Sequence, residues 1–129
     1  MCANCDGEPT LPQAYVIVHT DKATYGVNEL LAVTVENRGT DAATLWHCNY
    51  RPAFFVQIRV ADKWEEAFGV GTTCIGIYDA GQYPFGPGTI YEDTLRLESR
   101  VVSPGVYRLS YLIFDNGGKG LYSNVFVVE

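Results

Sequence analysis

The sequence predicts an all-β fold, an antiparallel β-sandwich of about seven to nine short strands. Runs rich in Val, Tyr and Thr alternate apolar with polar residues, and turn residues separate them at roughly 8–12-residue spacings. Charged residues make up only 19% of the chain, while 13 glycines supply turns. No stretch has a helical period.

The chain is expected to form one domain behind a tether. Residues 1–13 contain Gly7, Pro9 and Pro12 and no periodic pattern, which is typical of a flexible tether. Residues 14–129 are expected to form the sandwich domain. Of the 129 residues, 47% are hydrophobic and 13% aromatic, enough to fill a core and to exclude disorder.

Four strands are predicted in the first half of the domain, each bounded by turn residues. They cover residues 15–20, 30–36, 44–48 and 53–60. The second alternates most cleanly, with Leu31, Val33 and Val35 on one face. The residues of the fourth strand that share a face are Phe54, Val56, Ile58 and Val60.

The second half begins with a short connection at 61–63 and a strand over 64–68. Residues 69–88 hold many glycines and prolines, so we expect the longest loop region there, with a short strand at 74–78. Further strands are expected over residues 89–97, 106–114 and 122–128, with a glycine-rich turn over 115–120. In the strand over 106–114, the inward residues are Tyr107, Leu109, Tyr111 and Ile113.

Several motifs occur in an order that a known family shares. Residues 24–29 read Thr-Tyr-Gly-Val-Asn-Glu, and an alternating run and a small-residue turn follow. Together with 103–109 and 122–128, they resemble bacterial immunoglobulin-like domains of the secreted or lipoprotein type. The resemblance covers about residues 14–129 and implies a fold but no activity. It also implies that Tyr107 buries its ring and caps a neighbouring loop with its hydroxyl, as a tyrosine corner does.

The even number of cysteines suggests a disulfide. Cys48 and Cys74 would close a loop of about 27 residues, which stabilises a fold by roughly 3–4 kcal/mol. The alternative is two buried free thiols. A disulfide requires an oxidising compartment, so we expect an extracytoplasmic protein of the periplasm, the cell envelope or the secreted fraction.

Cys2 and Cys5 form a C-x-x-C motif near the start of the chain. A redox or zinc site is weakly supported, because neither a helix nor a second such motif follows. Cys2 instead fits the acylated cysteine of a bacterial lipoprotein, and a lipid there would be the only membrane anchor expected. The alternative is a flexible tail with incidental thiols, either free or bridged to each other.

No constellation for catalysis emerges, so we expect no enzyme, no catalytic residue, no cofactor and no metal. His47 and Cys48 are adjacent on a strand and point to opposite faces. His19 lies beside Asp21, as surface histidines often do next to turns. Residues 115–118 lack the spacing of a calcium loop. A net charge of −6 argues against nucleic acid as a partner.

The aromatic residues in or beside the glycine-rich region are the candidate binding loop: Tyr78, Tyr83, Phe85 and Tyr91. Rigid rings on loops favour recognition of a protein or polysaccharide partner. The alternative, favoured for Tyr25, is that such rings cover the core. We therefore expect a non-enzymatic binding or accessory domain. A proteinase inhibitor that inserts the loop 81–86 is the second hypothesis.

Overall fold

The computed structural model describes residues 15–48, 50–72, 80–100, 102–113 and 120–129. Within these ranges nearly every element is a β-strand, and the one helical element is the short 3-10 helix η1 (Leu97–Arg100). The search of these residues for a helix long and apolar enough to cross a membrane finds none. The all-β prediction is confirmed.

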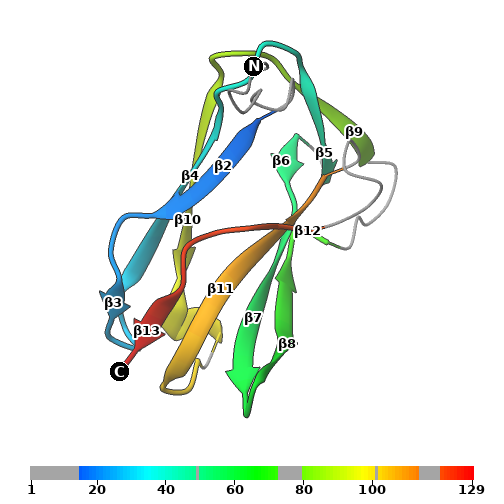
Figure 1. The fold of residues 1–129 in the computed structure, drawn as a ribbon. Coiled ribbons are helices and arrows are strands. Elements are labelled where there is room, and N and C mark those ends of the chain that lie inside the picture. Colours follow the sequence, from blue (N-terminus) through cyan, green and yellow to red (C-terminus); the bar gives the residue numbers. More distant parts are fainter. Residues whose placement is uncertain (1–14, 49, 73–79, 101, 114–119) are drawn as a thin grey trace, which may run out of the picture.

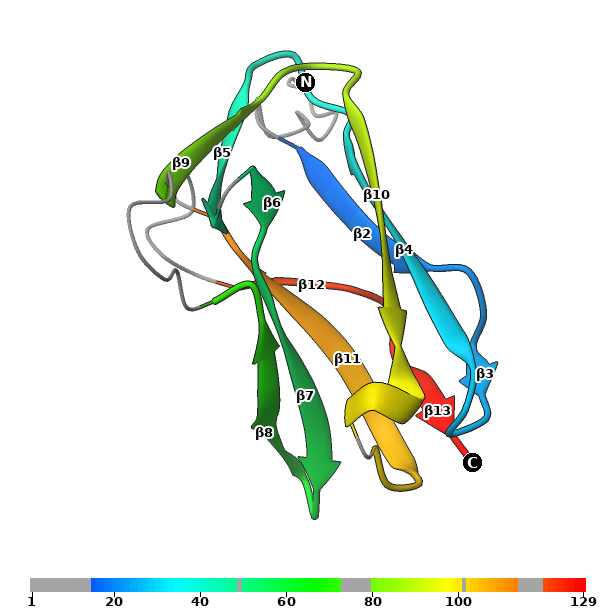
Figure 2. The same cartoon turned by 180° about the vertical axis from the view of Figure 1, so that it is seen from behind.

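Two sheets form the layers of a sandwich, as Figure 1 and the reverse view in Figure 2 show. The first sheet has the antiparallel order β10 (Ile90–Arg96), β4 (Leu30–Asn37) and β2 (Val16–Thr20). The second has the order β3 (Thr24–Tyr25), β13 (Phe126–Val128), β11 (Gly105–Leu112), β7 (Phe54–Val60) and β8 (Lys63–Val70). In addition, β12 (Gly120–Tyr122) pairs with β11.

A third, smaller sheet extends the second one. Its order is β6 (Arg51–Pro52), β5 (Ala43–Cys48) and β9 (Ala80–Phe85). An antiparallel bridge joins Leu45 of β5 to Ile113, the residue that follows the end of β11. The three sheets therefore enclose one continuous core.

The strand order is that of an immunoglobulin-like sandwich. Strands β2, β4 and β10 correspond to A, B and E of one sheet, and β7, β8, β11 and β13 correspond to C, C′, F and G of the other. Among the described strands, only β3 and β13 pair in parallel, with Thr24 opposite Val127. Eight described strands have five or more residues, namely β2, β4, β5, β7, β8, β9, β10 and β11.

Alternation along β4 and β11 positions the core as the sequence predicts. Leu31, Val33 and Val35 are buried, and so are the inward residues of β11. Val60 differs from the prediction, because its side chain is 45% exposed. It lies at the end of the β7–β8 hairpin, which extends past the layers (Figure 1).

Tyr107 forms the tyrosine corner that the resemblance implied. Its ring is buried near the start of β11, and its hydroxyl donates a hydrogen bond to the carbonyl oxygen of Ser103 at 2.6 Å. In antibody domains a cysteine stands two residues after this tyrosine. Here that position is Leu109, which is fully buried, so apolar packing takes the place of an inter-sheet disulfide.

The glycine-rich region contains a strand where a loop was expected. β9 pairs antiparallel with β5, from Ala43 opposite Phe85 to Cys48 opposite Ala80. Pro84 suggested a turn, but a proline fits an end strand, and β9 is at the end of its sheet within the described strands. The short strand expected at 74–78 lies outside the described residues.

Candidate functional site

The aromatic residues predicted as a binding loop do not form one exposed surface. Phe85 is fully buried in the core, so its assignment to an exposed loop is corrected. Tyr91 is half-buried on β10 and packs against the core. Tyr83 lies in β9 opposite Leu45, and Tyr78 lies outside the described residues. The expected inhibitor loop, 81–86, is largely strand β9, so the structure does not favour the second hypothesis.

The predicted disulfide falls partly outside the described residues. Cys48 lies at the end of β5 and is half-buried, and the described part of the chain contains no free cysteine thiol. Cys74 lies outside that part, so its bond with Cys48 stays a prediction. Cys2, with its expected lipid, and Cys5 are also outside it.

The two histidines occupy different environments. His47 is buried, and its Nδ1 accepts a hydrogen bond from the backbone N–H of Tyr50 at 2.8 Å. The rings of His47 and Tyr50 also stack, with centroids 5.5 Å apart. His19 is exposed on β2. In the ranges that the structure describes, no group of three or more His, Cys, Asp or Glu residues is placed to hold a metal ion.

The outer face of the second sheet carries a cluster of aromatic and cationic side chains. Side chains alternate along β11. Tyr107 and Leu109 point into the core, so Arg108 between them points away from the core. Gln57 on β7 lies directly opposite Arg108 and points the same way. The surface is therefore built on regular strands rather than on loops.

Two aromatic rings and one amide hold the guanidinium of Arg108. Its Cζ lies 3.6 Å from the ring centroid of Tyr122 on β12 and 4.4 Å from that of Trp64 on β8. Its Nε donates a hydrogen bond to Oε1 of Gln57 at 2.6 Å. We call Arg108, Trp64 and Tyr122 the Arg108 stack. Cation–π contacts of this kind contribute about 0.5–2 kcal/mol each.

Among the residues that the structure describes, the cations of this sheet have no acidic partner. Elsewhere in the described structure, cations form ion pairs at 2.8–3.2 Å, namely Lys22, Arg38, Arg51 and Arg96. Among the described Lys and Arg side chains, those outside any ion pair are Arg59, Lys63 and Arg108, on β7, β8 and β11. The Cζ of Arg59 lies 5.9 Å from the Trp64 ring centroid, so both arginines surround the same indole.

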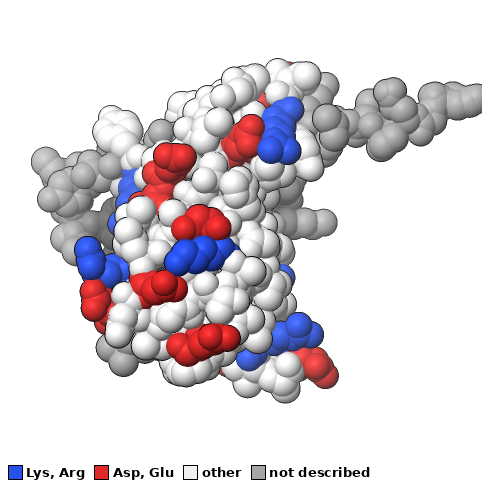
Figure 3. Space-filling view, turned by 90° about the vertical axis from the view of Figure 1, so that its left-hand side faces the viewer, with Lys and Arg blue, Asp and Glu red and all other residues white. Residues whose placement is uncertain are grey.

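The opposite face of the sandwich has a different charge pattern. Figure 3 shows the side on which β2, β4 and β10 lie, and there Lys and Arg side chains lie next to Asp and Glu. The pair of Arg38 with Glu36 of β4, at 3.2 Å, is one example. Exposed pairs of this kind contribute about 0–1 kcal/mol. The cation of such a pair is engaged by its own acid, so it attracts an acidic partner only weakly.

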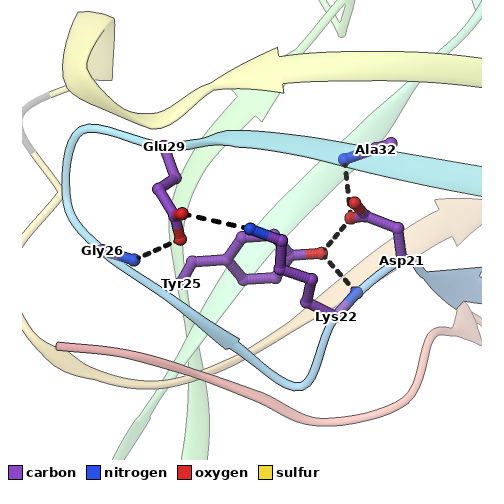
Figure 4. Close-up of polar contacts among 6 residues, drawn as sticks. All are labelled: Asp21, Lys22, Tyr25, Gly26, Glu29 and Ala32. Carbon is purple, nitrogen blue, oxygen red and sulfur yellow. Dashed lines mark hydrogen bonds and ion pairs between the residues drawn. The ribbon is translucent and has the colours of Figure 1, made fainter.

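A polar network fixes the connector between β2 and β4 (Figure 4). The hydroxyl of Tyr25 donates to the carboxylate of Asp21 and accepts from the backbone N–H of Lys22 at 2.9 Å. Asp21 also accepts from the N–H of Ala32 at 3.1 Å. Burial raises the pKa of Tyr25 to about 12, and the bond to Asp21 contributes to the rise. The ring is buried edge-on against Phe126, so Tyr25 covers the core, as expected.

Arg51 and Asp93 cover part of a sheet edge. β10 is the end strand of its sheet among the described strands. Oδ1 of Asp93 accepts from the N–H of Thr94 at 2.8 Å, while Nη2 of Arg51 donates to the Thr94 carbonyl at 3.4 Å. The two side chains pair at 2.8 Å. They satisfy backbone groups that an additional strand would otherwise use.

One buried hydroxyl has no hydrogen-bond partner in the part of the chain that the structure describes. It belongs to Tyr111, and no other buried side-chain nitrogen or oxygen in the described residues lacks one. The Tyr111 ring is fully buried and stacks on Phe54 with centroids 5.0 Å apart. Burial raises the pKa of Tyr111 far above its ordinary value, and the nearby carboxylate of Asp93 adds to the rise.

The Arg108 stack was not predicted from the sequence. The alternation of β11 was a usable signal, because it places Arg108 outside when Tyr107 and Leu109 are inside. The same alternation could not identify the residues that contact Arg108. Trp64 and Tyr122 are distant in the sequence, and only the pairing of β7, β8, β11 and β12 brings them together.

No protein-family model matches the chain, and no curated protein matches its sequence significantly. Among solved structures, the β-glucosidase EmGH1 from Erythrobacter marinus has a TM-score of 0.43 and 14% identity, over 90% of this chain and 16% of that one. The sporulation control protein Spo0M from Bacillus subtilis has a TM-score of 0.45 and 17% identity, over 92% and 50%. The CARDB domain of the PF1109 protein from Pyrococcus furiosus, in complex with di-metal ions, has a TM-score of 0.40 and 16% identity, over 95% of each chain.

This chain spans half or less of the first two proteins. At these TM-scores and identities, none of the three likenesses bears on what the chain binds or does.

Proposed function

We propose that the chain is a non-enzymatic binding or accessory domain that recognises its partner through the outer face of β7, β8, β11 and β12. The Arg108 stack is the observation that carries the proposal. Tryptophan, tyrosine and arginine dominate the binding energy of protein interfaces, and here they lie together on a rigid sheet. Tyr122 is 46% exposed, so a partner can reach the cluster.

The proposal moves recognition from the glycine-rich region to a sheet face. Phe85 was expected to contact the partner but is a core residue, so truncating it would test folding rather than binding. The outer face offers side chains that the core does not need. Strands also hold such side chains more precisely than loops do.

The proposal includes an extracytoplasmic location, supported by the position of Cys48. A bond from the end of β5 to Cys74 would staple the third sheet to the segment before β9. The proposed bond and location are tested on protein taken from its native compartment. Its intact mass is measured without reduction, and peptide mapping follows. We expect a Cys48–Cys74 peptide. Free thiols at both positions would contradict the location, and a lipid on Cys2 would be visible in the same spectra.

The binding proposal is tested with ligands chosen without regard to charge. The whole chain is screened against a random displayed peptide library and a panel of soluble polysaccharides. The affinity of each ligand found is then measured for wild type, for Tyr122→Ala, and for Ile90→Ser as a control. Ile90 is exposed on β10, in the other sheet.

We expect Tyr122→Ala to weaken binding at least fivefold, while Ile90→Ser leaves it unchanged. Thermal unfolding of each variant shows that the fold is kept. Ligands that bind equally well to Tyr122→Ala, or a screen that returns no ligand from either source, would overturn the proposed function.

A further inference from the structure

We infer that the Arg108 stack is a carboxylate receptor, and that its occupant is an acidic segment of a partner protein. The inference rests on the proposed function and adds the chemistry of the partner.

The guanidinium of Arg108 is held in place with its outer donors free. Its Nε is engaged by Gln57, and its position is fixed by the rings of Trp64 and Tyr122. Within the described residues, neither Nη nitrogen donates a hydrogen bond. Arginine has five N–H donors in a rigid fork that matches a carboxylate bidentately. Because the side chain is already ordered, binding loses little of its rotamer entropy.

The charge of the face complements an acid although the whole chain is acidic. The net charge of the chain is −6, yet on the described strands around the Arg108 stack, β7, β8, β11 and β12, the outward-facing charged residues are Arg59 and Arg108 against Glu66, which lies opposite Gln57. Neither arginine forms an ion pair with any acid in the described part of the chain. An acidic segment is repelled by most of the molecule and attracted here, so charge directs it to this face.

The cluster suits a protein better than a polysaccharide. A sugar ring usually needs an open aromatic face, and one face of the Tyr122 ring is covered by Arg108 at 3.6 Å. Trp64 has both guanidinium groups within 6 Å of its ring. Val127, on the adjoining β13, is exposed and points the same way as its register partner Val106. Apolar contacts beside an anchoring arginine are typical of protein interfaces.

The test follows the Nε–H signal of Arg108 and the indole N–H signal of Trp64 by NMR at low ionic strength. The probe is a short oligoglutamate peptide with capped ends, and the matched oligoglutamine peptide is the blank. Oligogalacturonate supplies the same carboxylate on a sugar chain. The variants are Arg108→Gln and Arg108→Lys, with Arg38→Gln on the opposite face as the control.

We expect oligoglutamate to shift both signals saturably, and oligoglutamine to shift neither. For the variants the readout is the Trp64 indole. Arg108→Gln should weaken binding about tenfold or more, as loss of a charge-assisted hydrogen-bond pair does. Arg108→Lys should weaken it nearly as much, because lysine keeps the charge but lacks the fork. Arg38→Gln should have no effect.

Three results would overturn the inference. Binding that does not saturate, or that Arg108→Lys retains fully, would mean that only diffuse charge attracts the peptide. Preferential binding of oligogalacturonate would mean that the partner is a polysaccharide. If the ligands from the screen lack acidic groups and bind through Tyr122 without Arg108, the carboxylate receptor is refuted while the proposed function stands.

Discussion

Deleting the hydroxyl from one of two tyrosines on β11 should destabilise the protein, whereas the same deletion from the other should not. Tyr107 and Tyr111 lie on the same strand, point to the same side and are both buried. The Tyr107 hydroxyl donates to the Ser103 carbonyl at 2.6 Å, whereas the Tyr111 hydroxyl has no hydrogen-bond partner among the described residues. Tyr107→Phe and Tyr111→Phe are therefore the same chemical change in two hydrogen-bonding contexts.

The expected magnitudes follow from the hydrogen bonds. Tyr107→Phe removes the bond to the Ser103 carbonyl and a longer contact, 3.4 Å, with the Ser103 hydroxyl, so we expect the free energy of unfolding to fall by about 1–1.5 kcal/mol. Burying a polar group without a hydrogen bond costs about 1–3 kcal/mol in folded proteins. Tyr111→Phe removes such a group and therefore removes this cost. This variant should be as stable as wild type or more stable by up to about 2 kcal/mol.

Urea unfolding at neutral pH measures both variants, with wild type in the same series. The midpoints should move apart while the slope m stays constant, because neither change alters the surface exposed on unfolding. If Tyr111→Phe destabilises the protein as much as Tyr107→Phe does, the Tyr111 hydroxyl has a bonding partner, such as a buried water. The prediction, which assumes that this hydroxyl makes no hydrogen bond, would then be wrong.

Three further perturbations test other features. Asn37→Ala removes donors to the carbonyls of Asp41 and Phe85, at 2.9 and 2.8 Å, and should lower the free energy of unfolding by about 2–4 kcal/mol; a loss below 1 kcal/mol would contradict this role. Asp93→Ala uncovers the Thr94 edge and should increase self-association in light scattering, unlike the control Glu92→Ala; equal association would refute the edge argument. Tyr25 holds its proton more tightly when folded, since its pKa rises from 10.0 to about 12, so the free energy of unfolding should fall as pH rises through that interval. Tyr25→Phe should flatten the fall, and an unchanged slope would show that other groups cause it.

Much of the fold was predictable because its strands alternate. Leu31, Val33 and Val35 identified the inner face of β4, and the same alternation fixed β11. β9 was missed, because Gly81 and Pro84 are strong local turn signals that pairing with β5 overrides. Local propensity cannot report a partner strand that lies far away in the sequence.

The candidate site was less predictable for a related reason. Phe85 was assigned to an exposed loop because glycines and prolines surround it, yet its strand brings the ring into the core. The Arg108 stack depends on registers between strands, including a bulge at Val56 and Gln57 that shifts β8 against β7. Alternation assigns a face to each residue, but only register assigns its neighbours.

The parallel pairing of β3 with β13 has a mechanical consequence. β3 lies between β2 and β4, near the beginning of the described chain, β13 lies near its end, and the two strands run in the same direction (Figure 1). Tension applied between the two ends slides one strand along the other. The bonds from the N–H of Val127 to Ala23 and of Glu129 to Tyr25, both 2.8 Å, then share the load and yield together rather than one at a time. A tethered domain under pull would thus be clamped at this pair.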